Sequence, residues 1–247
     1  VSTFPTYYGE KVEMRILDQS DATATLESVG LSGTNLSSVR DMMKAPFGII
    51  LIAGPTGSGK STTLFAMLSG LDREKMNVVS LEDPVEYEIS GVSQSQVRPE
   101  IGYTFASGLR SILRQDPDVI MVGEIRDKET AALAVQAALT GHLVFSTIHT
   151  NTAAGAIPRL ADMGVDPYLI APTLIAVIGQ RLVRKICPGA GKPFPVKDRI
   201  RDILDKDFAD LPQMYRNSLP PLKEFYRATP TDDCPTGTRG RTAVFEI

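Results

Sequence analysis

The sequence has little cysteine, few aromatic side chains and no tryptophan. Two cysteines among 247 residues are too few for a disulfide scaffold and fit a reducing compartment, so we expect a cytosolic protein. Aromatic side chains make up 6% of the chain, and 26 Lys and Arg face 29 Asp and Glu. A surface that binds nucleic-acid strands uses basic side chains and aromatic rings. We therefore expect no nucleic-acid partner.

Long apolar runs are also missing. The longest, residues 168–179, is interrupted by Pro172 and falls short of the roughly 18 to 20 residues that a membrane-spanning helix needs. We therefore expect no transmembrane helix. The chain starts at Val1 without an initiator methionine and stops in a strand-like run, TAVFEI, so we expect a fragment that is truncated at both ends.

From residue 46 onward, strand-like and helix-like patterns alternate. Short apolar runs rich in β-branched residues are typical of strands covered on both faces, and they occur at 48–53, 78–81, 119–122 and 143–147. Apolar residues with helical spacing lie between them, at 64–71, 105–113 and 128–140. This alternation predicts an α/β fold in which helices flank a mostly parallel central sheet.

The remaining segments have weaker patterns. Apolar and charged residues alternate over 11–16, which predicts a half-buried strand, and 18–45 is interpreted as a linker followed by a helix. We expect the α/β core at 46–187. Residues 188–233 are rich in Pro and Asp and are interpreted as a partly helical insertion, so that 188–247 holds the insertion and a carboxy-terminal strand.

The most specific motif is a glycine-rich loop. The string GPTGSGKS at 54–61 satisfies G-x-x-x-x-G-K-[ST] and lies directly between a predicted strand and a predicted helix. Its backbone N–H groups and the helix N-terminus can hold phosphate, while Lys60 would reach the β and γ phosphates and Ser61 would bind Mg²⁺. The predicted nucleotide-binding residues are Gly54, Pro55, Thr56, Gly57, Ser58, Gly59, Lys60, Ser61 and Thr62.

Acidic residues follow two of the predicted strands. Glu124 ends the run VIMVGE and is our preferred base for activating water, the alternative being a solvated side chain at a strand end. Glu82 and Asp83 follow the strand at 78–81 and are candidates to hold Mg²⁺ directly or through water. For Asp83, which precedes a proline, a role in a turn is the alternative.

Histidines and arginines leave two interpretations open. The only histidines, His142 and His149, bracket the predicted strand at 143–147, where they either sense the γ-phosphate or are hydrogen-bonded polar residues at strand ends. Arg110 and Arg114 share a predicted helix, where they either form surface ion pairs or contact a phosphate or another subunit. The residues alone do not decide between these interpretations.

Four ordered segments resemble motifs of the bacterial type II secretion and type IV pilus assembly ATPases. They are GPTGSGKSTTL (54–64), similar to the Walker A motif, LEDPVEY (81–87), similar to the aspartate box, LRQDPDVIMVGEIRD (113–127), similar to Walker B, and GHLVFSTIHTN (141–151), similar to the histidine box. Residues 1–17 also resemble the end of the family's PAS-like N-terminal domain, and 180–188 resembles the segment that leads into its zinc-binding region.

The resemblance implies a RecA-like, Mg²⁺-dependent ATPase core that assembles into a homo-hexameric ring. It also implies a motor for type IV pilus assembly or type II secretion, acting with an inner-membrane platform protein and other system components at the cytoplasmic face of the inner membrane. Arg15 is implied to reach the phosphates from the N-terminal domain, and Arg110, Arg114, His142 and His149 match functional positions. The alternatives are a pilus retraction or type IV secretion ATPase and a nucleotide-gated binding module that does not hydrolyse ATP.

One departure concerns zinc. The family's insertion begins with C-P-x-C and ends with a second cysteine pair, whereas this chain has Cys187 and Cys234, with Ala190 in place of another cysteine. A structural zinc takes about four N or S ligands. We therefore expect no zinc, and an insertion that is held by packing or is loose.

Overall fold

The computed structural model describes residues 1–14, 24–217 and 224–247. The chain divides into two compact units. The first consists of Val1–Leu182 with Ala243–Ile247, and the second of Val183–Thr242. Arg15 lies outside the described residues, so its predicted role stays a prediction.

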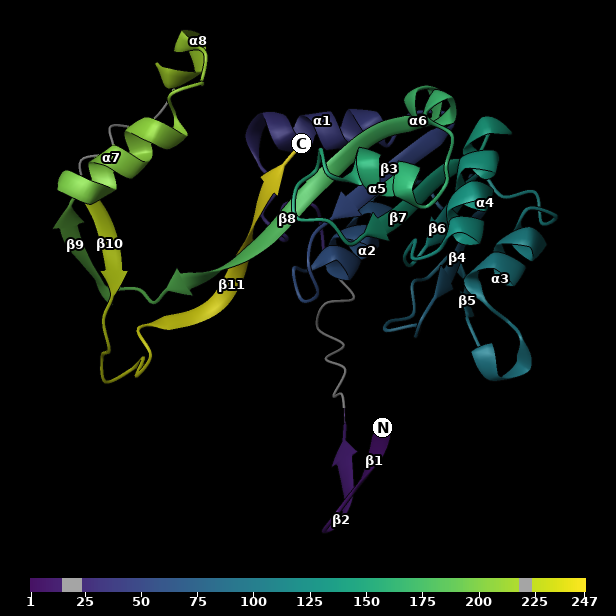
Figure 1. Cartoon of the computed structure of the whole chain (residues 1–247), viewed down its shortest axis with the longest axis horizontal. Coiled ribbons are helices and arrows are strands. Elements are labelled where there is room, and N and C mark those ends of the chain that lie inside the picture. Colours follow the sequence, from purple (N-terminus) through teal and green to yellow (C-terminus); the bar gives the residue numbers. More distant parts are fainter. Residues whose placement is uncertain (15–23, 218–223) are drawn as a thin grey trace. The chain divides into compact units, whose positions relative to one another are not determined.

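A seven-stranded sheet in the order β11-β8-β3-β7-β6-β4-β5 organises the first unit, and its strands β8 and β11 continue into the residues of the second unit (Figure 1). Its strands are β3 (Gly48–Ala53), β4 (Val78–Glu82), β5 (Ser93–Gln96), β6 (Val119–Val122), β7 (Leu143–Ile148), β8 (Leu174–Ile186) and β11 (Thr238–Glu246). All pairings among the six strands from β8 to β5 are parallel, which confirms the predicted sheet. Strands β3, β4, β6 and β7 are buried along their whole length, as their continuous apolar runs require.

Helices cover both faces of this sheet. They are α1 (Gly33–Met42), α2 (Lys60–Ser69), α3 (Phe105–Ile112), α4 (Lys128–Leu139), α5 (Ala156–Asp162) and α6 (Pro167–Thr173), and Pro99–Ile101 forms a 3₁₀ turn. Because side chains alternate along a strand, Ile49 and Leu51 pack on the side of α3 to α6. Ile50 and Ile52 pack on the other side, against α1 and α2. The result is the predicted arrangement of three layers.

Polar side chains fix where two of these helices begin. Asp127 is the N-cap of α4, and its two carboxylate oxygens accept hydrogen bonds from the backbone N and the Oγ1 of Thr130, both at 2.9 Å. Thr104 begins α3 with a capping box that it forms with Ser107. The predicted helix at 128–140 therefore matches α4 to within one residue.

The first residues form a hairpin of β1 (Ser2–Thr6) and β2 (Gly9–Glu13), paired antiparallel. Every residue of both strands is exposed, so the half-buried strand predicted at 11–16 is wrong in its burial over 11–14, and residues 15 and 16 lie outside the described ranges. A two-stranded hairpin by itself offers no second layer against which one face could pack.

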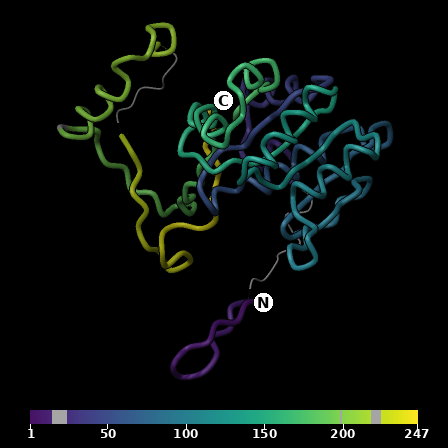
Figure 2. Tube along the Cα trace, turned by 45° about the vertical axis from the view of Figure 1, so that its right-hand side comes forward, coloured from purple at the N-terminus to yellow at the C-terminus, as the bar shows by residue number. Residues whose placement is uncertain are grey.

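The second unit contains the predicted, partly helical insertion (Figure 2). Strands β9 (Gly191–Pro195) and β10 (Glu224–Ala228) pair antiparallel in a two-stranded sheet, and α7 (Asp198–Asp207) and α8 (Gln213–Arg216) lie between them along the chain. Phe194 and Phe225 are cross-strand neighbours in this sheet with ring centroids 6.0 Å apart, and the Arg227 guanidinium lies 5.3 Å from the centre of the Phe194 ring.

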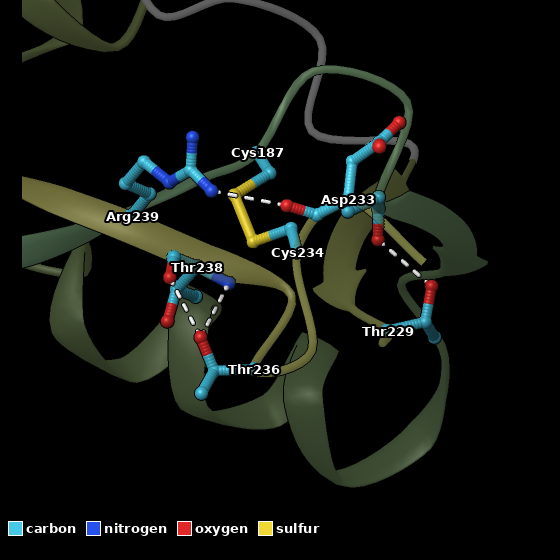
Figure 3. Close-up of a disulfide and its surroundings, with 8 residues drawn as sticks. Cys187, Thr229, Asp233, Cys234, Thr236, Thr238 and Arg239 are labelled. Carbon is cyan, nitrogen blue, oxygen red and sulfur yellow. Dashed lines mark hydrogen bonds between the residues drawn. A yellow bond between two sulfur atoms is a disulfide. The ribbon is translucent and has the colours of Figure 1, made fainter. Parts of the chain in front are cut away.

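A disulfide joins Cys187 to Cys234 across 47 residues (Figure 3). The expectation that packing alone holds the insertion, or that it is loose, is therefore wrong. The sequence did not indicate this link because the partners are distant along the chain and come together only when the insertion folds. Ala190 is fully buried beside both cysteines, at the position where the family pattern has another cysteine.

Membrane-spanning helices and metal-binding clusters are both absent from the described residues. Within 1–14, 24–217 and 224–247, no helix is long and apolar enough to cross a membrane. In the same part of the chain, no group of three or more His, Cys, Asp or Glu side chains is arranged to hold a metal ion.

Leu109 of α3 is fully buried against the sheet, whereas Leu139 at the end of α4 is 48% exposed. We expect Leu109→Ala to lower the free energy of unfolding by about 2–5 kcal/mol, since it removes buried methyl groups and leaves a cavity. Leu139→Ala should lower it by less than about 1 kcal/mol. Urea unfolding of the two variants and the parent checks this, and equal losses in both variants would contradict the packing described here.

Candidate active site

The carboxyl ends of the parallel strands meet at one edge of the sheet. Strand β3 runs into the glycine-rich loop at 54–59, β6 into Glu124 and β7 into His149. Strand β4 ends at Glu82, in register with Gln96 of β5. The sheet therefore brings together the loop, Glu82, Glu124 and His149.

The loop has the backbone conformation of a phosphate cradle. Gly57 and Gly59 have φ angles of 76° and 85°, a region that favours glycine, and α2 begins directly after them. The Ser58 side chain is 4% exposed, and its hydroxyl has no hydrogen-bond partner among the described residues. Backbone N–H groups at a helix N-terminus and an unpartnered hydroxyl suit an anionic ligand.

Lys60 folds back over this loop. Its Nζ donates hydrogen bonds to the carbonyl oxygens of Gly54, at 3.0 Å, and Pro55, at 2.9 Å. Burial is the largest influence on its pKa and lowers it, the Glu124 carboxylate acts to raise it, and Arg181 lowers it further. The ammonium group thus lies within electrostatic reach of an acid and of a second cation.

Glu124 lies between two basic groups. Its side chain is 12% exposed, and its Oε2 is 2.5 Å from the Arg126 Nε and 3.4 Å from the His149 Nε2. The backbone around it is fixed by neighbouring strands, because the N–H of Gly123 donates to the Leu81 carbonyl at 2.8 Å. These contacts hold one carboxylate oxygen at the edge that carries the loop.

Glu82 is more deeply buried, at 3% exposure. Its Oε1 accepts hydrogen bonds from the Ser80 Oγ at 2.5 Å and from the Gln94 Nε2 at 2.9 Å. Burial, the largest influence, raises the pKa of Glu82, and the two hydrogen bonds oppose this. Asp83, the next residue, is exposed.

The site residues suit a magnesium–nucleotide complex. Mg²⁺ in proteins usually keeps several waters and takes one or two carboxylates together with phosphate oxygens from the nucleotide. Ser61 at the start of α2 and the carboxylates of Glu82 and Asp83 at the end of β4 supply such donors. A site of this kind needs no cluster of three protein acids.

Three of the predicted residues lie away from the loop. His142 precedes β7, at the opposite edge of the sheet, where its Nδ1 lies 2.8 Å from the Ala137 carbonyl oxygen. Arg110 of α3 forms an ion pair with Glu129 of α4, and the Nη1 of Arg114 donates to the Arg110 carbonyl oxygen at 2.9 Å. Within this chain, His142 is thus a hydrogen-bonded residue at a strand end, and Arg110 forms an ion pair between two helices. Neither contact involves the loop.

Strand β8 contributes site residues that the sequence reasoning missed. Gly179 is in register with Ala53, which places Gln180 beside the loop. The buried Gln180 accepts a hydrogen bond from the Thr63 Oγ1 at 2.9 Å, and a Cβ added at Gly59 would lie 2.9 Å from its Nε2. Gln180 and Arg181 directly follow the apolar run 174–179 in the sequence. Polar residues at the end of a buried strand are the signal that would have indicated a contribution to the site.

A glycine-rich loop between a buried strand and a helix, at the carboxyl edge of a parallel sheet, defines a P-loop nucleotide-binding domain. The chain belongs to the family described as Type II/IV secretion system protein, which matches residues 1–247. This confirms the predicted family, and the geometry confirms the predicted α/β P-loop core.

Several known proteins are similar to this chain. Type II secretion system protein E of Aeromonas hydrophila is 48% identical, and type II secretion system ATPase E of Vibrio cholerae serotype O1 is 50% identical, each over 248 aligned residues. Both alignments cover 100% of this chain and 47% of the relative, so the chain spans about half the length of these relatives. The crystal structure of the pilus retraction motor PilT with bound ADP is 33% identical, with a TM-score of 0.60, over 87% of this chain and 64% of PilT.

The raised pKa of Glu82 predicts a pH dependence of stability. Because the folded state binds this proton more tightly than the unfolded chain, the associated stability is present below the ordinary pKa of 4.5 and is lost as the pH rises through the raised value. Glu82→Gln keeps an oxygen that accepts both hydrogen bonds but does not ionise. Without Mg²⁺, we expect the free energy of unfolding of the variant, relative to the parent, to rise above pH 4.5 and then level off.

The exposed Glu88 provides a matched control. Urea unfolding at a series of pH values should give Glu88→Gln the same pH profile as the parent. If the Glu82→Gln difference stays constant over the whole pH range, the pKa of Glu82 is not raised.

Proposed function

We propose that this chain is the ATP-hydrolysing motor domain of a type II secretion or type IV pilus assembly system. The observation that carries the proposal is the position of Glu124, which follows β6 at the edge of the sheet where β3 enters the P-loop and is held there by its contacts with Arg126 and His149. A phosphate chain in the loop then faces a carboxylate that can orient the attacking water and accept its proton.

The chain's own residues supply three parts of this chemistry. The N–H groups of the loop and Lys60 bind the phosphates, and Ser61 with Glu82 or Asp83 holds Mg²⁺, directly or through water. When bound, Mg²⁺ offsets the negative charge that builds up on the phosphate oxygens. Glu124 is the general base, and His149, 3.4 Å from it, orients the carboxylate and relays the state of the γ-phosphate.

The remaining predicted residues act where subunits and domains meet. In this proposal Arg15 reaches the phosphates from the N-terminal domain. Arg110, Arg114 and His142, which lie away from the loop in one chain, contact a neighbouring subunit of a homo-hexameric ring. An arginine that reaches a transferring phosphoryl group from another subunit contributes about 10³ to 10⁵ in rate.

The names of the relatives favour secretion or assembly over retraction. The relative at 50% identity is named a type II secretion ATPase, whereas the retraction motor PilT is 33% identical. By extension, this motor works with an inner-membrane platform protein at the cytoplasmic face of the inner membrane. The proposed organisation is a PAS-like remnant at 1–17, a linker and helix at 18–45, a RecA-like core at 46–187, and an insertion with a final strand at 188–247.

Hydrolysis by the parent and by Glu124→Gln tests the proposal. We expect Mg²⁺-dependent release of phosphate from ATP to increase per subunit as the protein concentration favours rings. Glu124→Gln should lower kcat by about 10²- to 10⁴-fold, since it removes the base, and should leave ATP binding in place. Turnover is measured by phosphate release, ATP affinity by equilibrium binding, and the size of the oligomer by light scattering, all at the same protein concentrations.

Glu74 is exposed and follows the far end of α2, so Glu74→Gln is the matched control and should retain full turnover. If the parent binds ATP tightly but turns over no faster than Glu124→Gln at every concentration, including those at which rings form, the chain is not a motor. A nucleotide-gated binding module then replaces the proposal.

A further inference from the structure

Arg181 follows Gln180 on β8, at the edge of the sheet that carries the P-loop. The register that pairs Ala53 with Gly179 places this part of β8 beside the start of the loop. Its guanidinium donates to the carbonyl oxygen of Asn151 at 2.6 Å and lies 3.4 Å from the Asn151 Oδ1. Asn151 lies in the loop after β7, on the other side of β3. The Arg181 side chain therefore spans the end of the strand from which the P-loop starts.

This position puts two cations close together. The charge of Arg181 acts on the Lys60 ammonium and lowers the pKa of that lysine. In the described part of the chain, Arg181 forms no ion pair, and its hydrogen bonds go only to Asn151. A guanidinium has five N–H donors in a fixed plane, so most of them lack a protein partner. Two cations without full pairing by acids suit a polyanion.

We propose that Arg181 binds the terminal phosphate of the nucleotide in the same chain, exchanging its contact with Asn151 for that phosphate. The assignment rests on the function proposed above and adds a residue to the site. Guanidinium groups bind phosphate through two parallel N–H bonds, a geometry that an ammonium group does not provide. Lys60 reaches the β and γ phosphates, so a second cation close to it can bind the γ-phosphate. Because ADP has no γ-phosphate, this contact would favour ATP over ADP.

Equilibrium binding of ATP and of ADP, each with Mg²⁺, tests this assignment. The titrations use the Glu124→Gln background, so that ATP is not consumed. We expect Arg181→Ala to weaken ATP binding about ten- to a hundredfold and ADP binding by about twofold or less. Arg181→Lys should recover part of the ATP affinity, since it keeps the charge but not the two parallel bonds. A structural tether alone would change both affinities equally, so the ratio of the ATP and ADP dissociation constants is the decisive quantity.

Arg73 gives a matched control because its guanidinium also donates to a backbone carbonyl, that of Ser90, at 2.6 Å. It follows the far end of α2, and Arg73→Ala should leave both affinities unchanged. If Arg181→Ala keeps the parent's ratio of ATP to ADP affinity, the assignment is wrong while the ATPase proposal stands. If the parent chain itself binds neither nucleotide, both fail.

Discussion

The backbone pairing of β3 with β7 on one side and β8 on the other determines where the functional groups lie. All three strands run in the same direction, so the segments that follow them are brought to one edge. The P-loop follows β3, His149 follows β7, and Gln180 and Arg181 belong to β8. A register shift of one residue would exchange the β3 side chains between the two buried layers and would also displace the loop relative to its neighbours.

Acidic and basic side chains lie close together at this edge of the sheet, and Glu124 is at the centre of their contacts. Glu124 is close to Arg126 and His149 and acts on Lys60, while Lys60 and Arg181 form no ion pair with an acid among the described residues. Glu82 is kept apart, in a buried position with two hydrogen-bond donors. Two carboxylates on neighbouring strands thus have different surroundings, and such differences allow two acids in one site to take different roles.

The sequence predicted the features that depend on local pattern. The runs at 48–53 and 119–122 match β3 and β6 to the residue, because continuous apolar runs define strands buried on both faces. The apolar run at 168–179 contains the end of α6 and the start of β8. Periodicity alone does not show where a helix ends and a strand begins within one apolar run, so the sequence did not predict this boundary. The disulfide and the contact between Arg181 and Asn151 join residues far apart in the chain, which no local pattern reveals. His142 and His149 share one motif, yet a buried strand separates them and places them at opposite edges.

The hydrogen bonds from the Lys60 ammonium to two carbonyl oxygens of its own loop have a further consequence. They tie Gly54 and Pro55 to the start of α2 and so restrict the backbone of the loop, which makes anion binding an exchange of hydrogen-bond partners. Little backbone entropy is then lost when an anion arrives, and little is regained when it leaves. Such a preorganised cradle can be filled and emptied repeatedly while the helix behind it keeps its structure.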